Sequence, residues 1–321
     1  MITENKIINK YLKVLSFRNN KALNFSDDVY FDESKKIIFS TDTYEEDIHF
    51  LNSNNPKKFA KKIFRSSISD IICKGCKPTV YFLSLSLRKV NLKWLKIFTN
   101  ELYSDSKKYG LFLGGGDTIK SKKFSVTISV LGEVKHQPVL RKNAKQNEDI
   151  YVTGNLGNSY LGLLVNSKKK NFGKMNRSLI KSFLLPDLPF KFSKKINNFA
   201  SSSMDISDGL LKDLNSLCAS SKCGAHIYYN HLPFSKNAQN LAKHKKVNLL
   251  NIFSKGDDYQ ILFTANKKFR RLISSTSKNT KTKVTRIGKV ISTKTVKMTD
   301  KNIIFDLRHV KTGYIHKFNK E

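Results

Sequence analysis

The chain has 321 residues, of which 59 are Lys or Arg and 25 are Asp or Glu, giving a formal net charge of +34 at pH 7. Its 39% hydrophobic and 11% aromatic residues suffice for a buried core, which excludes a disordered basic tail and a fibrous protein. The longest nearly apolar stretch, 79–87, is far shorter than the roughly 20 residues of a membrane-spanning helix. With no secretory signal at the start, we expect a cytoplasmic protein without a membrane partner.

The positive charge invites a nucleic-acid function, because Lys and Arg neutralise phosphates. The lysines are spread over the whole chain, however, and form no basic stripe interleaved with aromatic residues. This distribution is typical of solvated helix faces and loops and argues against nucleic acid as the partner. A basic nucleic-acid-binding protein remains an alternative.

The first half of the chain predicts a mixed α/β unit. Hydrophobic periodicity indicates a strand at 37–41, a helix at 57–72, a strand at 80–87, a helix at 90–108, a short strand at 111–113 and a half-exposed strand at 124–134. The short strand runs into Gly114–Gly116 and Asp117, where backbone N–H groups could approach a phosphate. The pattern pauses at 136–138, so we place an N-terminal domain at 1–137 and a C-terminal domain at 138–321.

The second half predicts another α/β unit. A strand at 149–153 is followed by a glycine turn and a helix through 164. The segment 204–210 leads into a helix that ends near 220, with Ser207 or Asp208 expected to cap it. Further strands are expected at 225–229, 259–264 and 284–291. The fold class is therefore two α/β domains with mixed sheets.

Four cysteines offer a second possible chemistry. Cys73 and Cys76 have the spacing of a zinc or redox motif, whereas Cys218 and Cys223 do not repeat it. We favour semi-buried structural cysteines that stay reduced.

Aspartates gather beside small residues. Nine of the 17 lie in short clusters next to Gly, Ser or Thr: Asp27, Asp28, Asp42, Asp70, Asp117, Asp205, Asp208, Asp257 and Asp258. Carboxylates that converge at strand ends would repel one another unless a hard divalent cation neutralised them, and oxygen ligands point to Mg²⁺. Phosphate chemistry is the main use of such a site, yet the sequence contains neither a P-loop nor a dinucleotide fingerprint.

The ordered series of these motifs is more specific than any one of them. It runs through Ser26-Asp27-Asp28, Ser40-Thr41-Asp42-Thr43 with His49-Phe50, Ser69-Asp70, Gly115-Gly116-Asp117-Thr118, Met204-Asp205-Ile206-Ser207-Asp208-Gly209-Leu210 and Gly256-Asp257-Asp258-Tyr259. In this order the series resembles the thiamine-monophosphate kinases, of the superfamily that includes aminoimidazole ribonucleotide synthetase and selenophosphate synthetase. The resemblance covers about residue 20 to residue 314.

The resemblance implies ATP-dependent phosphorylation of thiamine monophosphate to thiamine diphosphate, with several Mg²⁺ ions, by a homodimer that pairs through its N-terminal domains. It implies a magnesium shell of Asp28, Ser40, Thr41, Asp42, Asp70, Asp117, Asp205 and Asp208, with Asp42, Asp70 and Asp117 catalytic. The implied nucleotide contacts are Tyr109, Gly116, Asp117, Arg141 and Ser207, and the implied contacts to the thiamine end of the substrate are His49, Asp257 and Tyr314.

Five positions depart from the family's usual residues: Ser26, Ser67, Lys255, Asp257 and Gln260. Asp257 is one methylene shorter than the usual Glu, which bears directly on its substrate contact. Ser26, Lys255 and Asp257 leave an inactive family member open as an alternative. Another ATP-dependent synthetase or kinase of the same superfamily is a separate alternative.

Overall fold

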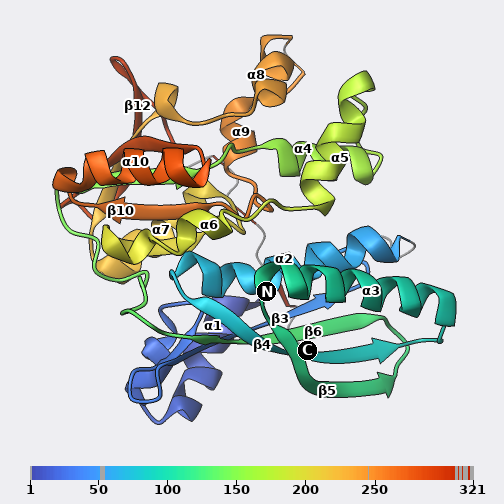
Figure 1. The fold of residues 1–321 in the computed structure, drawn as a ribbon. Coiled ribbons are helices and arrows are strands. Elements are labelled where there is room, and N and C mark those ends of the chain that lie inside the picture. The colour runs from blue at the N-terminus through green and yellow to red at the C-terminus, as the bar shows by residue number, and fades with distance from the viewer. Residues whose placement is uncertain are drawn as a thin grey trace.

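Two mixed β-sheets, one in each half of the chain, organise the computed structural model (Figure 1). The structure describes residues 2–50, 55–244, 246–307, 310, 313 and 317–318. The first sheet has five strands and the second has seven, and a short pair joins β1 (Ile2–Thr3) to β14 (Lys317–Phe318) near the chain ends. This arrangement confirms the predicted mixed α/β fold class.

The N-terminal sheet has the strand order β2-β3-β6-β4-β5. Only β4 and β5 are parallel, while the other neighbours are antiparallel. The bounds are β2 (Tyr30–Asp32), β3 (Ile37–Glu45), β4 (Lys77–Leu87), β5 (Phe112–Lys120) and β6 (Ser125–Glu133). The short α1 (Glu4–Ile7) precedes them, and the helices α2 (Pro56–Cys73) and α3 (Leu92–Tyr109) lie between this sheet and the C-terminal half in Figure 1.

The two faces of this sheet differ in character. Along β6, Val126, Ile128 and Val130 are buried and alternate with half-buried polar residues, which confirms the predicted period of two. On the opposite face, the Thr41 hydroxyl lies 2.8 Å from that of Ser129. The sheet therefore has an apolar face against the helices and a second face lined in part by hydroxyl groups.

Helix α2 links the two halves of the molecule. It begins after Asn55, whose side chain accepts the Lys58 N–H, and has Pro56 in its first turn, where no backbone donor is needed. Twelve of its residues are buried, three of them serines. The hydroxyls of Ser66 and Ser67 donate to the carbonyls one turn earlier, so these buried polar groups are satisfied within the helix.

The C-terminal sheet has the order β13-β12-β9-β11-β7-β10-β8 and is antiparallel except for β12 beside β9. Its strands are β7 (Asp149–Thr153), β8 (Ala200–Asp205), β9 (Gly224–Tyr228), β10 (Ile261–Ala265), β11 (Val284–Ile291), β12 (Val296–Asp300) and β13 (Ile303–Ile304). Its helices are α4 (Asn158–Asn166), α5 (Asn176–Leu184), α6 (Phe190–Ser193), α7 (Leu210–Ser221), α8 (Lys236–Lys243), α9 (Leu249–Phe253) and α10 (Arg270–Thr280).

The apolar cores follow the two sheets, and a smaller cluster joins them. Cys73, at the end of α2, packs in one cluster with Val139, Phe192 and Phe263 of the C-terminal half. The interval between β6 and β7 contains the expected domain boundary at 137/138. Because α2 packs into both halves, side chains on its later turns can take part in a site shared by both sheets.

Two local predictions need correction. The strand predicted at 111–113 is longer, because β5 continues through the glycine run, and a Cβ on Gly116 would lie 1.9 Å from the Leu83 carbonyl oxygen of β4. Glycine is required there for close strand approach. Neither Ser207 nor Asp208 caps α7; its N-cap is Gly209, and the Asp213 carboxylate accepts the N–H groups of Asp208 and Gly209.

A buried ion pair fixes α3 against α2. The Asp105 side chain is 2% exposed and accepts from Arg65 Nε at 2.6 Å and from Lys61 Nζ at 3.0 Å. Burial by itself raises the pKa of Asp105, but the hydrogen bonds from Arg65 and Lys61 outweigh it and hold the pKa below its ordinary value.

Asp105 should therefore stabilise the fold above the pKa of the unfolded carboxyl, about 3.9, and lose that contribution as the pH falls below it. We expect Asp105→Asn to lower the free energy of unfolding at pH 7 by about 3 kcal/mol, because Arg65 and Lys61 lose their charged partner. Urea unfolding at pH 7 and at pH 3 measures both effects. A variant as acid-sensitive as the wild type would contradict the assignment.

No helix within the described ranges combines the length and the apolar character needed to cross a membrane.

Candidate functional site

Three carboxylates meet where the two halves of the molecule touch. Asp28 precedes β2, Asp70 lies on α2 and Asp205 ends β8, and one oxygen of each lies within 4.8 Å of the others. Asp205 is 2% exposed and accepts the Ser69 hydroxyl at 2.6 Å. The sequence interpretation grouped these residues by motif, and the fold brings them together from three separate elements.

Asp42 belongs to the same electrostatic environment. Burial, followed by the charges of Asp205 and Asp28, raises the pKa of Asp42, and burial together with the charges of Asp42, Asp205 and Asp28 raises that of Asp70 well above its ordinary value. Burial and Asp28 likewise raise the pKa of Asp205. These carboxylates destabilise one another when all are ionised and no cation is present.

The donor set fits Mg²⁺. All of the groups are hard oxygen donors, and the Ser40 hydroxyl, buried on the same face of β3 as Asp42, has no hydrogen-bond partner. An oxygen cage with excess negative charge and an unsatisfied hydroxyl is the chemistry of a magnesium site.

Two other expected ligands lie elsewhere. The Thr41 side chain is on the opposite face of β3 from Asp42 and hydrogen-bonds Ser129, so its hydroxyl does not face the carboxylates. The Asp208 carboxylate is half-exposed and pairs with Lys212 Nζ at 2.6 Å. Within this conformation neither side chain joins the group formed by Asp28, Asp70 and Asp205.

Of the residues expected in the magnesium shell, Asp117 lies farthest from the other carboxylates. The register aligns Asp42, Ile128, Leu83 and Gly116 in one row across the sheet, so three inter-strand spacings, about 14 Å, separate β3 from β5. Asp117 itself pairs with Ser84 on the face that the helices leave open. It is exposed, and a single chain does not bring it to the other carboxylates.

Of the expected nucleotide contacts, Arg141 and Ser207 lie beside the cluster. The Arg141 guanidinium pairs with Asp28, while its backbone N–H donates to Asp27 at 2.7 Å. The Ser207 carbonyl accepts the Asp257 N–H at 2.8 Å, and a Cβ on Gly256 would lie 1.7 Å from this oxygen. Glycine at 256 thus permits the two loops to touch.

Tyr109 has different surroundings. It is buried in the N-terminal core at the end of α3, edge-on to the Phe190 ring with centroids 5.2 Å apart. Burial raises the pKa of its hydroxyl, and the charged groups that act on it are Arg65, Asp105 and Asp187. The position is that of a packing aromatic.

Two of the three expected substrate residues, His49 and Asp257, lie within the described part of the chain. His49 follows β3; its Nδ1 accepts the Glu45 N–H at 3.0 Å and its ring is edge-on to Tyr44. Asp257 has a left-handed backbone with φ 71° and pairs with Lys62 Nζ at 2.5 Å. Tyr314 lies outside the described residues.

Tyr44 and Lys62 connect these groups and were not expected from the sequence. The Tyr44 hydroxyl lies 3.1 Å from Ser67 Oγ and 3.4 Å from Asp42 Oδ2. Lys62 Nζ lies 4.8 Å from the centre of the Tyr259 ring. The alternation of β3 could have revealed Tyr44, because residues 42 and 44 share a face; no local signal identifies Lys62.

Gln260 and the cysteines have structural roles. Gln260 Oε1 accepts from Thr153 at 2.9 Å, and its Nε2 donates to the Asp187 carbonyl at 3.0 Å. All four cysteines are free and buried. Burial raises the pKa of Cys73 and Cys76, which makes these thiols unreactive.

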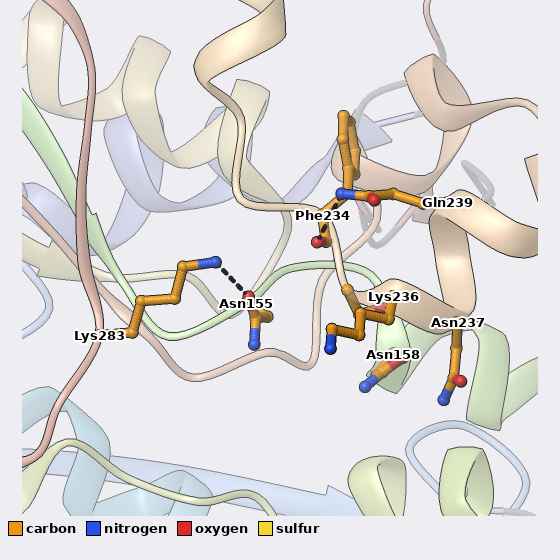
Figure 2. Close-up of a pocket in the computed structure, with 8 residues that line it drawn as sticks. Asn155, Asn158, Phe234, Lys236, Asn237, Gln239 and Lys283 are labelled. Atoms are coloured by element: carbon orange, nitrogen blue, oxygen red, sulfur yellow. Dashed lines mark hydrogen bonds between the residues drawn. The ribbon is translucent and has the colours of Figure 1, made fainter.

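A cavity of about 500 Å³ lies in the C-terminal half, away from the carboxylates. Figure 2 shows its polar lining, in which Lys283 Nζ donates to Asn155 Oδ1 at 2.6 Å. It is lined by Asn155, Asn158, Phe234, Ser235, Lys236, Asn237, Gln239 and Lys283. No residue expected from the sequence to act in catalysis lines it.

Comparisons with known proteins show which family the chain is similar to. Residues 23–134 match the family model described as AIR synthase related protein, N-terminal domain. The chain is 35% identical over 326 residues to thiamine-monophosphate kinase of Buchnera aphidicola subsp. Schizaphis graminum (strain Sg), covering 98% of each chain. It is 32% identical to the Escherichia coli (strain K12) thiamine-monophosphate kinase, covering 81% of this chain and 82% of the relative.

A solved structure shares the whole architecture. The structure described as AaThiL complexed with AMPPCP and TMP has a TM-score of 0.84 and 25% sequence identity, covering 98% of this chain and 97% of that chain. The fold and the match of residues 23–134 place the chain in the class of AIR synthase-related folds. Within that class, the chain belongs to the thiamine-monophosphate kinase family, and it is therefore a kinase.

Proposed function

We propose that this protein transfers the γ-phosphoryl group of ATP to thiamine monophosphate and so forms thiamine diphosphate. The observation that carries the proposal is the convergence of Asp28, Asp70 and Asp205 from both halves of the chain. Such a site lies where two anionic substrates could meet between the domains that we place at 1–137 and 138–321. The relatives named thiamine-monophosphate kinase and the AaThiL complex with AMPPCP and TMP support this choice of substrates.

Asp28, Asp42, Asp70 and Asp205 would hold magnesium. When bound, Mg²⁺ neutralises phosphate charge and stabilises the charge that develops on the transferred group. Arg141, beside Asp28, is placed to pair with a nucleotide phosphate once its carboxylate partner is engaged.

The acceptor needs no general base. A phosphate monoester has a second pKa near 6, so its oxygen is largely ionised at neutral pH. The chain's own residues then position the two phosphates in line and exclude water, and we infer direct transfer without a phosphorylated enzyme.

We also propose a homodimer in which Asp117 acts on the partner's site. Asp117 lies on the open face of the N-terminal sheet, too far from Asp42 within one chain. The same sheet exposes apolar side chains on β4 and β5, among them Phe82 and Phe112, the latter 63% exposed. A second copy packed on this face would cover them and supply Asp117. Four free cysteines fit the reducing cytoplasm that we propose as its location.

Asp257 should contribute to binding of the cationic thiamine end of the substrate. We expect Asp257→Asn to raise the KM for thiamine monophosphate about tenfold, because one charge-assisted contact is lost. The KM for ATP in the same variant is the control and should stay within about twofold. Equal changes in both constants would show that Asp257 only holds the fold.

The primary test follows product directly. Purified protein is incubated with ATP, Mg²⁺ and thiamine monophosphate, and thiamine diphosphate is separated by chromatography. We expect product that requires both ATP and Mg²⁺ and that disappears with EDTA. A folded protein that forms no product under these conditions would overturn the proposed function.

A further inference from the structure

A fully buried lysine adjoins the carboxylate cluster. Lys74 directly follows α2, four residues after Asp70, and its side chain is 0% exposed. Its ammonium lies 2.7 Å from Asp27 Oδ1 and donates to the Ser203 carbonyl on β8 at 2.8 Å. Lysine is almost never buried unless it is paired, so this position calls for a reason.

Asp27 connects this ammonium to the site. Its Oδ1 also accepts the N–H of Asp28 at 2.9 Å, and its Oδ2 accepts the N–H of Arg141 at 2.7 Å. The Lys74 and Asp27 pair thus contacts the backbone of a proposed magnesium ligand and that of a proposed nucleotide contact.

Lys74 is charged in the folded protein. Burial opposes its ionisation, but Asp27, Cys73 and Asp28 together outweigh burial and leave the pKa of Lys74 above its ordinary value. The same positive charge acts against the rise in pKa of Asp70 and Asp205. A fixed positive charge therefore lies among carboxylates that otherwise repel one another.

We propose that Lys74 is a built-in counter-cation of the carboxylate site, which stabilises the metal-free fold and weakens the binding of divalent cations. The inference rests on the magnesium site of the proposed function. Its physical basis is competition, because a positive charge held beside the ligands repels an incoming divalent cation at short range.

Mn²⁺, whose free form gives a measurable paramagnetic resonance signal, is the probe. Lys74→Met should tighten Mn²⁺ binding about tenfold, since the repelling charge is lost and Asp27 is left uncompensated. Its unfolding temperature without metal should fall, and saturating Mg²⁺ should raise that temperature by more than in the wild type. Lys77→Met, at an exposed position on β4, is the matched control and should behave like the wild type.

Two more variants keep the proposal testable if Lys74→Met folds poorly. Asp27→Asn leaves Lys74 uncompensated and should weaken Mn²⁺ binding about tenfold, whereas the double variant Asp27→Asn with Lys74→Met should return near the wild-type affinity. If Lys74 and Asp27 had only a structural role, the two single variants would not change Mn²⁺ affinity in opposite directions. If Mn²⁺ affinity were unchanged in both single variants, or weaker in both, the proposed role of Lys74 as a counter-cation would be wrong. A wild type that binds no Mn²⁺ would overturn the magnesium site as well.

Discussion

Asp70→Asn is expected to lower kcat for thiamine diphosphate formation about a thousandfold while the protein stays folded. Asp70 lies on α2 with its carboxylate close to those of Asp28 and Asp205, and burial plus the charges of Asp42, Asp205 and Asp28 raise its pKa well above the ordinary value. Removing its charge relieves repulsion in the metal-free protein. We therefore expect its unfolding temperature without Mg²⁺ to rise and the stabilisation by Mg²⁺ to shrink.

Lower activity together with higher metal-free stability would distinguish the loss of a magnesium ligand from damage to the fold. Initial rates and thermal unfolding, each with and without Mg²⁺, measure them in the same preparations. Asp300→Asn serves as the matched control and should retain activity. Asp300 lies on β12, near the edge of the C-terminal sheet opposite to β8, which carries Asp205. Near-native turnover of Asp70→Asn would remove the carboxylate cluster from the mechanism.

Mixing two inactive variants should restore activity if Asp117 acts across a dimer. Asp70→Asn and Asp117→Asn are each expected to be inactive alone. In a mixed dimer one site carries both substitutions and the other carries neither. Random exchange makes half of the dimers mixed, so we expect about a quarter of the wild-type activity.

The mixing experiment requires the two variants to exchange subunits. Labelled copies of the two variants can demonstrate this exchange independently of activity. The rate should rise with the same time course as the exchange. Full exchange with no recovered activity would show that Asp117 does not complete a partner's site. An active Asp117→Asn protein would show that this carboxylate is dispensable.

The charges of the site are balanced locally, although the chain as a whole is strongly positive. The carboxylates of Asp42 and Asp70 are half-buried, that of Asp205 is buried, and the three repel one another, whereas Lys74 and Arg141 neutralise the adjacent Asp27 and Asp28. The outer surface can be strongly positive without weakening the site, and a positive surface increases the encounter rate with anionic substrates.

Local pattern alone predicted the long elements of the N-terminal half. The apolar spacing of 57–72 predicted α2 within one residue at each end, and the alternation of 124–134 predicted β6 within one residue. These signals are reliable because a buried face imposes its period directly on the sequence. The strand predicted at 111–113 was too short, because the glycine at 116 is required by close approach to Leu83 on a neighbouring strand, which no local pattern reports.

The sequence by itself also predicted the kind of chemistry, since clustered aspartates beside small residues indicate an oxygen-ligated cation whichever strands bear them. Only the tertiary structure decided which carboxylates meet. It brings Asp28, Asp70 and Asp205 together, places Asp117 on the far side of the sheet, and buries Lys74 beside Asp27. Spacing along a chain fixes the face on which a side chain lies, whereas distances between elements depend on strand order and on how the two sheets pack around α2.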